Sequence, residues 1–336
     1  MKKAGDIVSR AEIKEYLMKA VETENISHAY LFTGEKGSGK LLLAQFFAEA
    51  ILCTGQGEKP CGTCKSCVQA DSGNQPDIRK IVHEKASIGV DEIREQINQD
   101  ILIKPYSSKY KIYIMEDADK MTEQAQNALL KTIEEPPEYA VIMLLAENEN
   151  RLLETIRSRV VKLEVKPVDR ETIKQFLMKE KQVPDYLAEE SAKFSQGNIG
   201  KAIRYAASED FMELKQNVLH LLRYLSDMTI VEIVEGIKEI GGRKEEVQDI
   251  LDLMILWYRD VLMCKVTSDP NQLLFKEDFK SLKELARKID YEGIDQIIEA
   301  VDKAKQRLKA NVNFDMTMQL LMLTIKENEN GTSNRS

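Results

Sequence analysis

The chain has 336 residues, of which 43% are hydrophobic and 31% are charged, and its formal net charge is -8. This length exceeds one ordinary compact core, because domains commonly hold about 100–200 residues, and the composition excludes a mostly disordered chain. The acidic excess excludes a uniformly cationic nucleic-acid binder, so any contact with DNA would need a local patch, helix N-termini or partner chains.

The hydropathy pattern contains no candidate membrane anchor. No apolar run approaches the ~20 residues that cross a bilayer, and the longest, residues 140–146, predicts a buried strand. The N-terminal residues 1–17 lack the apolar core of a signal peptide. The sequence therefore favours a cytoplasmic protein.

The first 165 residues alternate short apolar runs with helical patterns. Strands are predicted at 28–32, 78–82, 111–115, 140–146 and 160–165, and helices at 41–52, from residue 89 onward with Asp91 as N-cap, and at 122–134. Strands that alternate with helices indicate a parallel sheet covered on both faces. Residues 1–165 are therefore expected to form an α/β domain.

The pattern changes after Pro167, where helical periods dominate. Residues 166–207 are long enough for a small helical lid, and residues 208–327 predict a larger all-α domain. The polar tail, residues 328–336, is expected to be disordered. The predicted fold class is α/β plus all-α, in three domains.

A glycine-rich loop joins the first predicted strand to the first predicted helix. Its sequence GEKGSGK has the GxxxxGK pattern of a P-loop, in which Gly34, Gly37 and Gly39 let backbone N–H groups approach phosphate oxygens and Lys40 reaches the terminal phosphates. The alternative is a glycine-rich turn without a ligand. Leu41 stands where the magnesium-binding Ser or Thr belongs, and leucine cannot coordinate a cation.

The second part of a nucleotide site is also altered. An apolar strand that ends in Asp-Glu would hold Mg²⁺ and activate the attacking water, but residues 111–115 are followed by Glu116 and Asp117 in the reverse order. A misplacement of ~1 Å can lower a rate about 10²-fold. These residues predict an inactive or crippled NTPase site, and ATP or ADP binding stays open and doubtful.

Four of the five cysteines fall within fifteen residues: Cys53, Cys61, Cys64 and Cys67. Four clustered thiolates suit one tetrahedral Zn²⁺, and a closed four-thiolate shell is structural because no position remains for water. An iron–sulfur cluster is the first alternative, but its common Cys-x3-Cys-Pro ending is missing. A disulfide or redox pair is the second alternative. Cys264 stands apart and is expected to be a small buried residue.

Several segments together resemble the bacterial clamp-loader AAA+ subunits of DNA polymerase III. They are GEKGSGK, the cysteine cluster, residues 104–137 with NALLKTIEEPP, TIRSR at 155–159, SQGNIGKAI at 195–203, WYRD at 257–260 and NVNFDMTMQLLML at 311–323. The similarity extends from His28 to about Leu323. It implies an AAA+ P-loop domain with a zinc module inserted at 53–67, a helical lid, and a C-terminal helical collar that oligomerises.

The resemblance also separates this chain from the ATP-hydrolysing members of that family. The tau/gamma subunits keep Lys-Thr in the P-loop, Asp-Glu in the second motif and an arginine in the segment matching Gly197–Lys201. Here Leu41, Glu116-Asp117 and Gly200 occupy those places. The resemblance therefore implies a non-hydrolysing subunit of the DNA polymerase III assembly, one that is not itself catalytic.

The Ser-Arg motif of the family is retained at Ser158 and Arg159, with Val160 in place of the usual cysteine. The resemblance implies that Arg159 extends into the ATP site of a neighbouring subunit, where a guanidinium supplied in trans stabilises transition-state charge. The alternative is an ordinary surface arginine. Four scattered lysines are expected to form a solvated face rather than a DNA site: Lys104, Lys109, Lys111 and Lys120.

The implied partners are the delta and tau/gamma subunits in a hetero-pentameric ring, the sliding clamp, and primed DNA through the assembled complex. One alternative function is an active ATPase motor of the same ring. Another is a zinc-dependent DNA-binding module unrelated to clamp loading, which the acidic composition disfavours.

Overall fold

The computed structural model describes residues 10–83, 85–241 and 246–330. The chain divides into two compact units, Met1–Arg204 and Tyr205–Ser336, which are described separately. The first unit contains both the predicted α/β domain and most of the predicted lid. Most of the predicted tail, and the start of the N-terminal segment, lie outside the described residues.

The first unit is built on a five-stranded parallel sheet with strand order β2-β3-β4-β1-β5. The strands are β1 (Ala29–Thr33), β2 (Ile78–Ile81), β3 (Lys111–Met115), β4 (Ala140–Ala146) and β5 (Val161–Glu164). β1 lies between β4 and β5, with Tyr30 opposite both Met143 and Val161. All five predicted strands are confirmed, each with bounds shifted by one residue at most.

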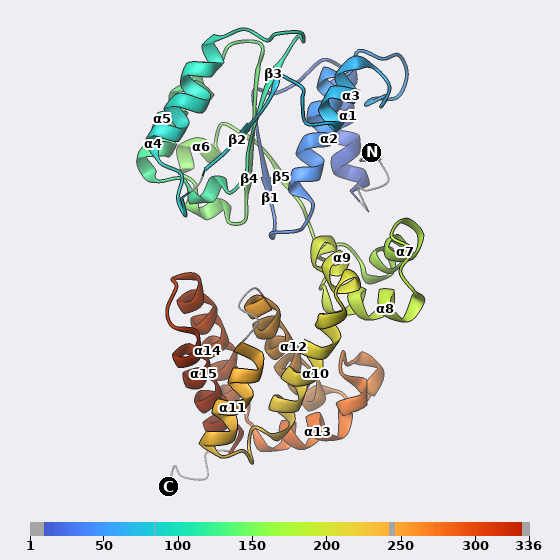
Figure 1. The fold of residues 1–336 in the computed structure, drawn as a ribbon, viewed down its shortest axis with the longest axis vertical. Coiled ribbons are helices and arrows are strands. Elements are labelled where there is room, and N and C mark those ends of the chain that lie inside the picture. The colour runs from blue at the N-terminus through green and yellow to red at the C-terminus, as the bar shows by residue number, and fades with distance from the viewer. Residues whose placement is uncertain (1–9, 84, 242–245, 331–336) are drawn as a thin grey trace. The chain divides into compact units, whose positions relative to one another are not determined.

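Helices cover both faces of this sheet (Figure 1), as expected for parallel strands. On one face, Phe32 packs with Leu17 of α1 and Phe47 of α2, and on the other Leu31 packs with Leu129 of α5. The helices of this part are α1 (Ala11–Glu22), α2 (Lys40–Leu52), α3 (Lys65–Asp71), α4 (Val90–Ile93), which continues as the π-helical turn η2 (Arg94–Gln99) and the 3-10 turn η3 (Asp100–Leu102), then η4 (Ala118–Lys120), α5 (Glu123–Glu134), η5 (Glu149–Arg151) and α6 (Glu154–Arg157).

The helix predicted from residue 89 onward is confirmed, but its predicted N-cap, Asp91, is wrong. α4 begins at Val90, and its N-cap is Gly89, which has extended backbone and makes no side-chain cap. Asp91 lies inside the first turn, where its carboxylate still favours the helix through the positive end of the macrodipole.

Residues 166–207, the predicted lid, contain α7 (Arg170–Glu180), α8 (Asp185–Phe194) and α9 (Ile199–Ala207); this segment is called the lid below. Asp169 caps α7, because its carboxylate accepts a hydrogen bond from the Thr172 N–H at 2.8 Å. α7 and α8 pack on each other, and the start of α9 returns to the P-loop.

The second unit is all-helical among its described residues (Figure 1). α12 lies at its centre, in contact with α10, α13 and α14, and buries Leu251, Met254 and Tyr258. Its helices are α10 (Glu209–Tyr224), α11 (Ile230–Gly241), α12 (Val247–Val266), η7 (Pro270–Gln272), η8 (Lys276–Asp278), α13 (Phe279–Lys288), α14 (Tyr291–Lys309) and α15 (Phe314–Glu329). In the described part of the chain, no helix is long and apolar enough to cross a bilayer.

The polar tail begins later than the sequence predicts. α15 continues to Glu329, whose side chain is 1% exposed, so the prediction that disorder begins at residue 328 is wrong. Tyr258 donates a hydrogen bond to Glu329 Oε1 at 2.6 Å. Glu329 Oε2 has no partner among the described residues. A helix end is thus held by a buried carboxyl group.

This buried carboxyl group predicts a pH dependence of stability. Burial raises the pKa of Glu329 to about 7, although Tyr258, Lys288 and Lys326 oppose the shift. A raised pKa means that the folded state holds the proton more tightly than the unfolded state. The contribution of this group to stability is therefore fully present below the ordinary glutamate pKa and is lost as the pH rises through about 7. The loss at pH 8 is on the order of 3 kcal/mol.

Glu329→Gln should remove this loss, because the amide stays neutral and its oxygen still accepts from Tyr258. Thermal melts at pH 5 and pH 8 should show a smaller difference for Glu329→Gln than for the unchanged chain. Glu327→Gln is the control, since Glu327 is exposed on the same helix. Equal pH dependence in both variants would contradict the assignment.

Candidate functional site

The P-loop occupies the position that the sequence predicts, between β1 and α2. Gly37 and Gly39 have φ values of 85° and 95°, a region that favours glycine. Lys40 Nζ donates hydrogen bonds to the carbonyl oxygens of Gly34 at 2.5 Å and Glu35 at 2.8 Å. The lysine that would contact terminal phosphates therefore uses two of its three donors on its own loop.

The lid contacts the next two carbonyl groups of the loop. Asn198 Nδ2 donates to the Lys36 carbonyl oxygen at 2.8 Å, and the Gly200 N–H donates to that of Gly37 at 2.9 Å. A Cβ atom added at Gly200 would lie 2.8 Å from the Gly37 oxygen. A residue with a side chain at position 200 would therefore not fit without displacing this backbone from the loop.

A buried arginine, Arg10, contacts the last carbonyl group of the loop. Arg10 donates to the carbonyl oxygen of Ser38 at 2.9 Å and also to that of Lys166, where β5 leads into the lid. Burial lowers the pKa of Arg10. Every carbonyl group from residue 34 to residue 38 thus accepts a hydrogen bond from a lysine, an arginine or the lid, which fixes the loop by contacts within the chain.

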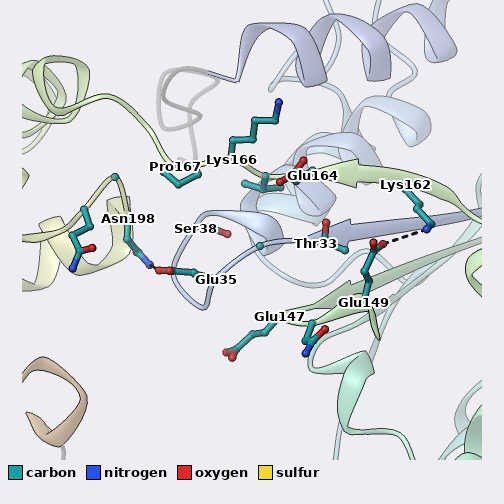
Figure 2. A pocket seen from close by; sticks show the side chains of 15 residues that line it. Thr33, Glu35, Ser38, Glu147, Glu149, Lys162, Glu164, Lys166, Pro167 and Asn198 are labelled. Carbon is teal, nitrogen blue, oxygen red and sulfur yellow. Dashed lines mark hydrogen bonds and ion pairs between the residues drawn. The ribbon is translucent and has the colours of Figure 1, made fainter. Parts of the chain in front are cut away.

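A cavity of about 700 Å³ lies beside the loop, between the ends of the strands and the lid (Figure 2). Its charged lining is more acidic than basic, and it consists of Glu35, Glu147, Glu149, Glu164, Lys162 and Lys166. Lys162 is paired with Glu149 at 3.4 Å (Figure 2). This charge balance opposes the binding of a polyphosphate.

Lys40 experiences the same acidic surroundings. Burial lowers the pKa of Lys40, and the nearby carboxylates of Glu147, Asp119, Asp117 and Glu35 oppose that shift. These four carboxylates already compensate the ammonium charge, so a phosphate group would gain less from it than in an ordinary P-loop.

Neither Leu41 nor the second motif offers a metal ligand in the cavity. Leu41, in the first turn of α2, is partly buried and packs against the sheet core. Glu116 is exposed, and Asp117 has a φ of 54° and pairs with Lys120 Nζ at 2.7 Å. Neither Glu116 nor Asp117 is among the described residues that line the cavity. Asp119, which the sequence did not indicate, is buried and accepts a hydrogen bond from the Glu147 N–H at 3.1 Å.

The four clustered cysteines are brought together as predicted. Their Sγ atoms all lie within 4.8 Å of one another, and all four thiols are free of disulfides. Cys53 ends α2, Cys64 is the N-cap of α3 and Cys67 lies in its first turn, while Cys61 lies in the loop between these helices. One metal ion could be held by this donor set.

Backbone N–H groups donate to Sγ atoms of the cluster, whereas burial raises the pKa of Cys53 and of Cys67. The N–H of Cys64 donates to Cys61 Sγ at 3.3 Å, and that of Cys67 donates to Cys64 Sγ at 3.5 Å. Burial acts to raise the pKa of Cys64, but N–H donors from Cys67 and Thr54 outweigh it and lower this pKa to about 5. A Cβ atom at Gly55 would lie 2.5 Å from Cys61 Sγ, so glycine at 55 leaves room for the sulfur cluster.

Arg159 follows α6 and has a side chain that is 42% exposed. Its Nη1 donates to the Thr155 carbonyl oxygen at 3.0 Å and to Ser158 Oγ at 3.2 Å, and its Nη2 lies 3.1 Å from Glu134 Oε1. The neighbouring Arg157 is engaged with Glu154. Arg159 is therefore ordered at the surface of the first unit, outside the cavity beside the P-loop.

The lysines expected to form a solvated face are mostly paired. Lys109 and Lys120 make surface ion pairs with Glu24 and Asp117. Lys111 differs, because it is buried and donates to the carbonyl oxygens of Asp100 and Ile103 at 2.7 Å and 3.1 Å. The prediction of solvent exposure is wrong for Lys111, which stabilises the end of η3.

In the second unit, a groove runs between α14 and α15, lined by Lys303, Arg307 and Leu320 among others. Met316 and Leu320, one helical turn apart on α15, are 68% and 48% exposed. Trp257, which belongs to one of the motifs shared with the family, is 1% exposed and belongs to the core of this unit.

Comparisons with known proteins match nearly the whole chain. The family model described as "DNA polymerase III, delta subunit" matches residues 9–169, and "DNA polymerase III, delta subunit, C terminal" matches residues 210–327. The chain is 31% identical over 318 residues to DNA polymerase III subunit delta' of Bacillus subtilis (strain 168), which covers 94% of this chain and 95% of that protein.

A second relative and one solved structure extend the comparison. DNA polymerase III subunit tau of B. subtilis (strain 168) is 27% identical over 327 residues, which are 90% of this chain and 58% of that protein. The crystal structure of a DNA polymerase III gamma subunit-related protein from Thermotoga maritima matches with a TM-score of 0.51 and 20% identity, over 94% of this chain and 99% of that one. At this identity the structural match shows the fold alone, an AAA+ clamp-loader-like fold.

Proposed function

The chain belongs to the family of DNA polymerase III delta' subunits, and from this membership we propose that it is a non-hydrolysing, structural subunit of the replicative clamp loader. The observation that carries the non-hydrolysing part is the state of the P-loop. Lys40 donates to carbonyl groups of its own loop, and the lid and Arg10 donate to the remaining ones. Leu41 is partly buried and packs against the sheet core. Neither bound ATP nor ADP is needed to hold this loop in place.

The chain would work as part of a hetero-pentameric ring with delta and tau/gamma subunits, in the cytoplasm. The ring would open the sliding clamp and load it onto primed DNA, which this chain would meet through the assembled complex. The second unit would form the collar that joins the subunits. The exposed Met316 and Leu320 support this role, because apolar side chains that remain exposed on one helix mark a contact surface.

Arg159 would act on the neighbouring subunit's ATP site. A guanidinium at the γ-phosphate stabilises the charge that develops in phosphoryl transfer. The exposed and ordered side chain of Arg159 supports this role, since it is held by groups of its own chain without being buried.

The cysteine cluster would hold one structural zinc ion per chain. Zn²⁺ accepts four thiolates in a tetrahedral shell at ~2.3 Å, and no open position is left for a substrate. When bound, the ion would fix residues 53–67 against α2 and α3. The lowered pKa of Cys64 and the space at Gly55 both support metal binding.

One result tests the non-hydrolysing assignment directly. The isolated chain is expected to hydrolyse ATP no faster than its Lys40→Ala variant, because Leu41 gives Mg²⁺ no ligand and the second motif lies outside the cavity. The measurement is steady-state phosphate release at saturating Mg²⁺ and ATP. Turnover near or above about 1 s⁻¹, within the range of ordinary enzymes, that Lys40→Ala abolishes would identify an active motor like the tau/gamma subunits. Nucleotide binding without turnover would agree with the proposal.

A further inference from the structure

Glu134 is the carboxylate that contacts Arg159, although 25 positions separate the two residues in the sequence. Glu134 is the last residue of α5, and the residue before it, Ile133, is 1% exposed in the sheet core. The backbone under Glu134 is therefore fixed by packing, while its side chain is 46% exposed. A carboxylate at a helix C-terminus is disfavoured by the macrodipole, so a helical role does not account for Glu134.

The contacts of Arg159 are arranged on two sides of its guanidinium. On one side, Nη1 is bound to the Thr155 carbonyl oxygen and to Ser158 Oγ, both from the turn that precedes it. On the other side, Nη2 is bound to Glu134 from α5. A guanidinium has five N–H donors, so these three interactions fix the plane of the group and leave donors free for a ligand.

We propose that Glu134 is a positioning residue for Arg159, which holds the guanidinium in the orientation that a neighbouring subunit's phosphate group requires. This inference rests on the proposed function of Arg159 in trans. A long, exposed arginine side chain otherwise samples many rotamers, and this side-chain entropy is lost when the guanidinium binds the phosphate. The ion pair between Glu134 and Arg159 fixes one orientation of the guanidinium before the subunits associate. An exposed ion pair of this kind stabilises the fold little, so its effect should appear in catalysis rather than in folding.

The experiment uses clamp-loader complexes reconstituted with the full chain carrying Glu134→Ala, Glu134→Gln or Glu135→Ala. Glu135 is the matched control, because it is the next residue, is also exposed and leaves Glu134 unchanged. Glu134→Ala should lower the part of kcat for ATP hydrolysis that depends on Arg159 by about tenfold. KM and co-elution of the subunits should stay unchanged. Glu134→Gln should have a smaller effect, because its amide oxygen still accepts from the guanidinium.

The double variant Glu134→Ala/Arg159→Ala separates positioning from other effects. It should be no slower than Arg159→Ala alone, since a positioning residue has nothing to act on once the arginine is gone. A further loss in the double variant, or a Glu134→Ala rate equal to or above that of Glu135→Ala, would overturn this inference while leaving the proposed function intact. If Arg159→Ala itself is without effect, the proposed function fails instead.

Discussion

Cys64→Ser is expected to release the metal ion and to lower the stability of the chain by about 4 kcal/mol, the range in which loss of a bound metal falls. The physical reason is that the free energy of metal binding is partly folding free energy, because the ligands converge only in the folded state. Cys64 both supplies a sulfur and caps α3 through its bond from the Cys67 N–H. Zinc content by elemental analysis and thermal melting would measure the two effects.

Cys264→Ser is the matched control, since Cys264 lies outside the cluster of four and in the other unit. It should keep one zinc ion per chain. The unchanged chain, purified without chelator, should also contain one zinc ion. Iron in place of zinc, or no metal at all, would be evidence against the structural zinc site.

Arg159→Ala is expected to slow ATP hydrolysis at the neighbouring site of a reconstituted complex by about 10³-fold or more, the size of effect measured for arginines supplied in trans. Hydrolysis by the whole complex should fall only in part, because the other sites of the ring use other arginines. Subunit assembly, zinc content and melting temperature should stay close to those of the unchanged complex, since the contacts of Arg159 lie at the surface.

Arg159→Lys and Arg151→Ala define this effect more closely. Lysine should restore little activity, because an ammonium lacks the planar fork that contacts two phosphate oxygens together. Arg151 is an exposed arginine shortly before the motif, and its removal should change nothing. Equal rates for Arg159→Ala and Arg151→Ala would mean that Arg159 is an ordinary surface residue.

The sheet and the cysteine cluster were predictable because both depend on local sequence signals. Each strand is a short apolar run bounded by breaking residues, and the parallel order follows from the helices between them. The cysteines lie within fifteen residues, so a single turn and two helix ends bring them together. The altered P-loop was also visible, because Leu41 is wrong for magnesium in any fold.

The contacts that hold the P-loop could not be predicted, because they join residues far apart in the chain. Arg10 lies 28 positions before Ser38, and Asn198 lies 162 positions after Lys36. Nothing in the sequence marks Arg10 as buried, and arginine is seldom buried without a charged partner. The sequence indicates only that Gly200 is not an arginine, whereas the structure shows that a glycine here allows the lid backbone to approach Gly37.

The ion pair between Glu134 and Arg159 could not be predicted either, because the two residues are far apart in the sequence. The NALLKTIEEPP segment that contains Glu134 carries part of the family resemblance, and nothing in the sequence marks this glutamate as a partner of Arg159. Their contact depends on the end of α5 lying beside the turn after α6, which only the folded chain shows.

In the proposed function, this chain supplies an arginine to a neighbouring subunit and does not itself hydrolyse ATP. The most direct test of this function is a side-by-side steady-state ATPase measurement, with DNA and clamp present, on complexes that carry Lys40→Ala or Arg159→Ala in this subunit alone. We expect a rate near that of the unchanged complex for Lys40→Ala and a clear fall for Arg159→Ala. A damaging Lys40→Ala together with a silent Arg159→Ala would contradict the proposed function and make this subunit a motor.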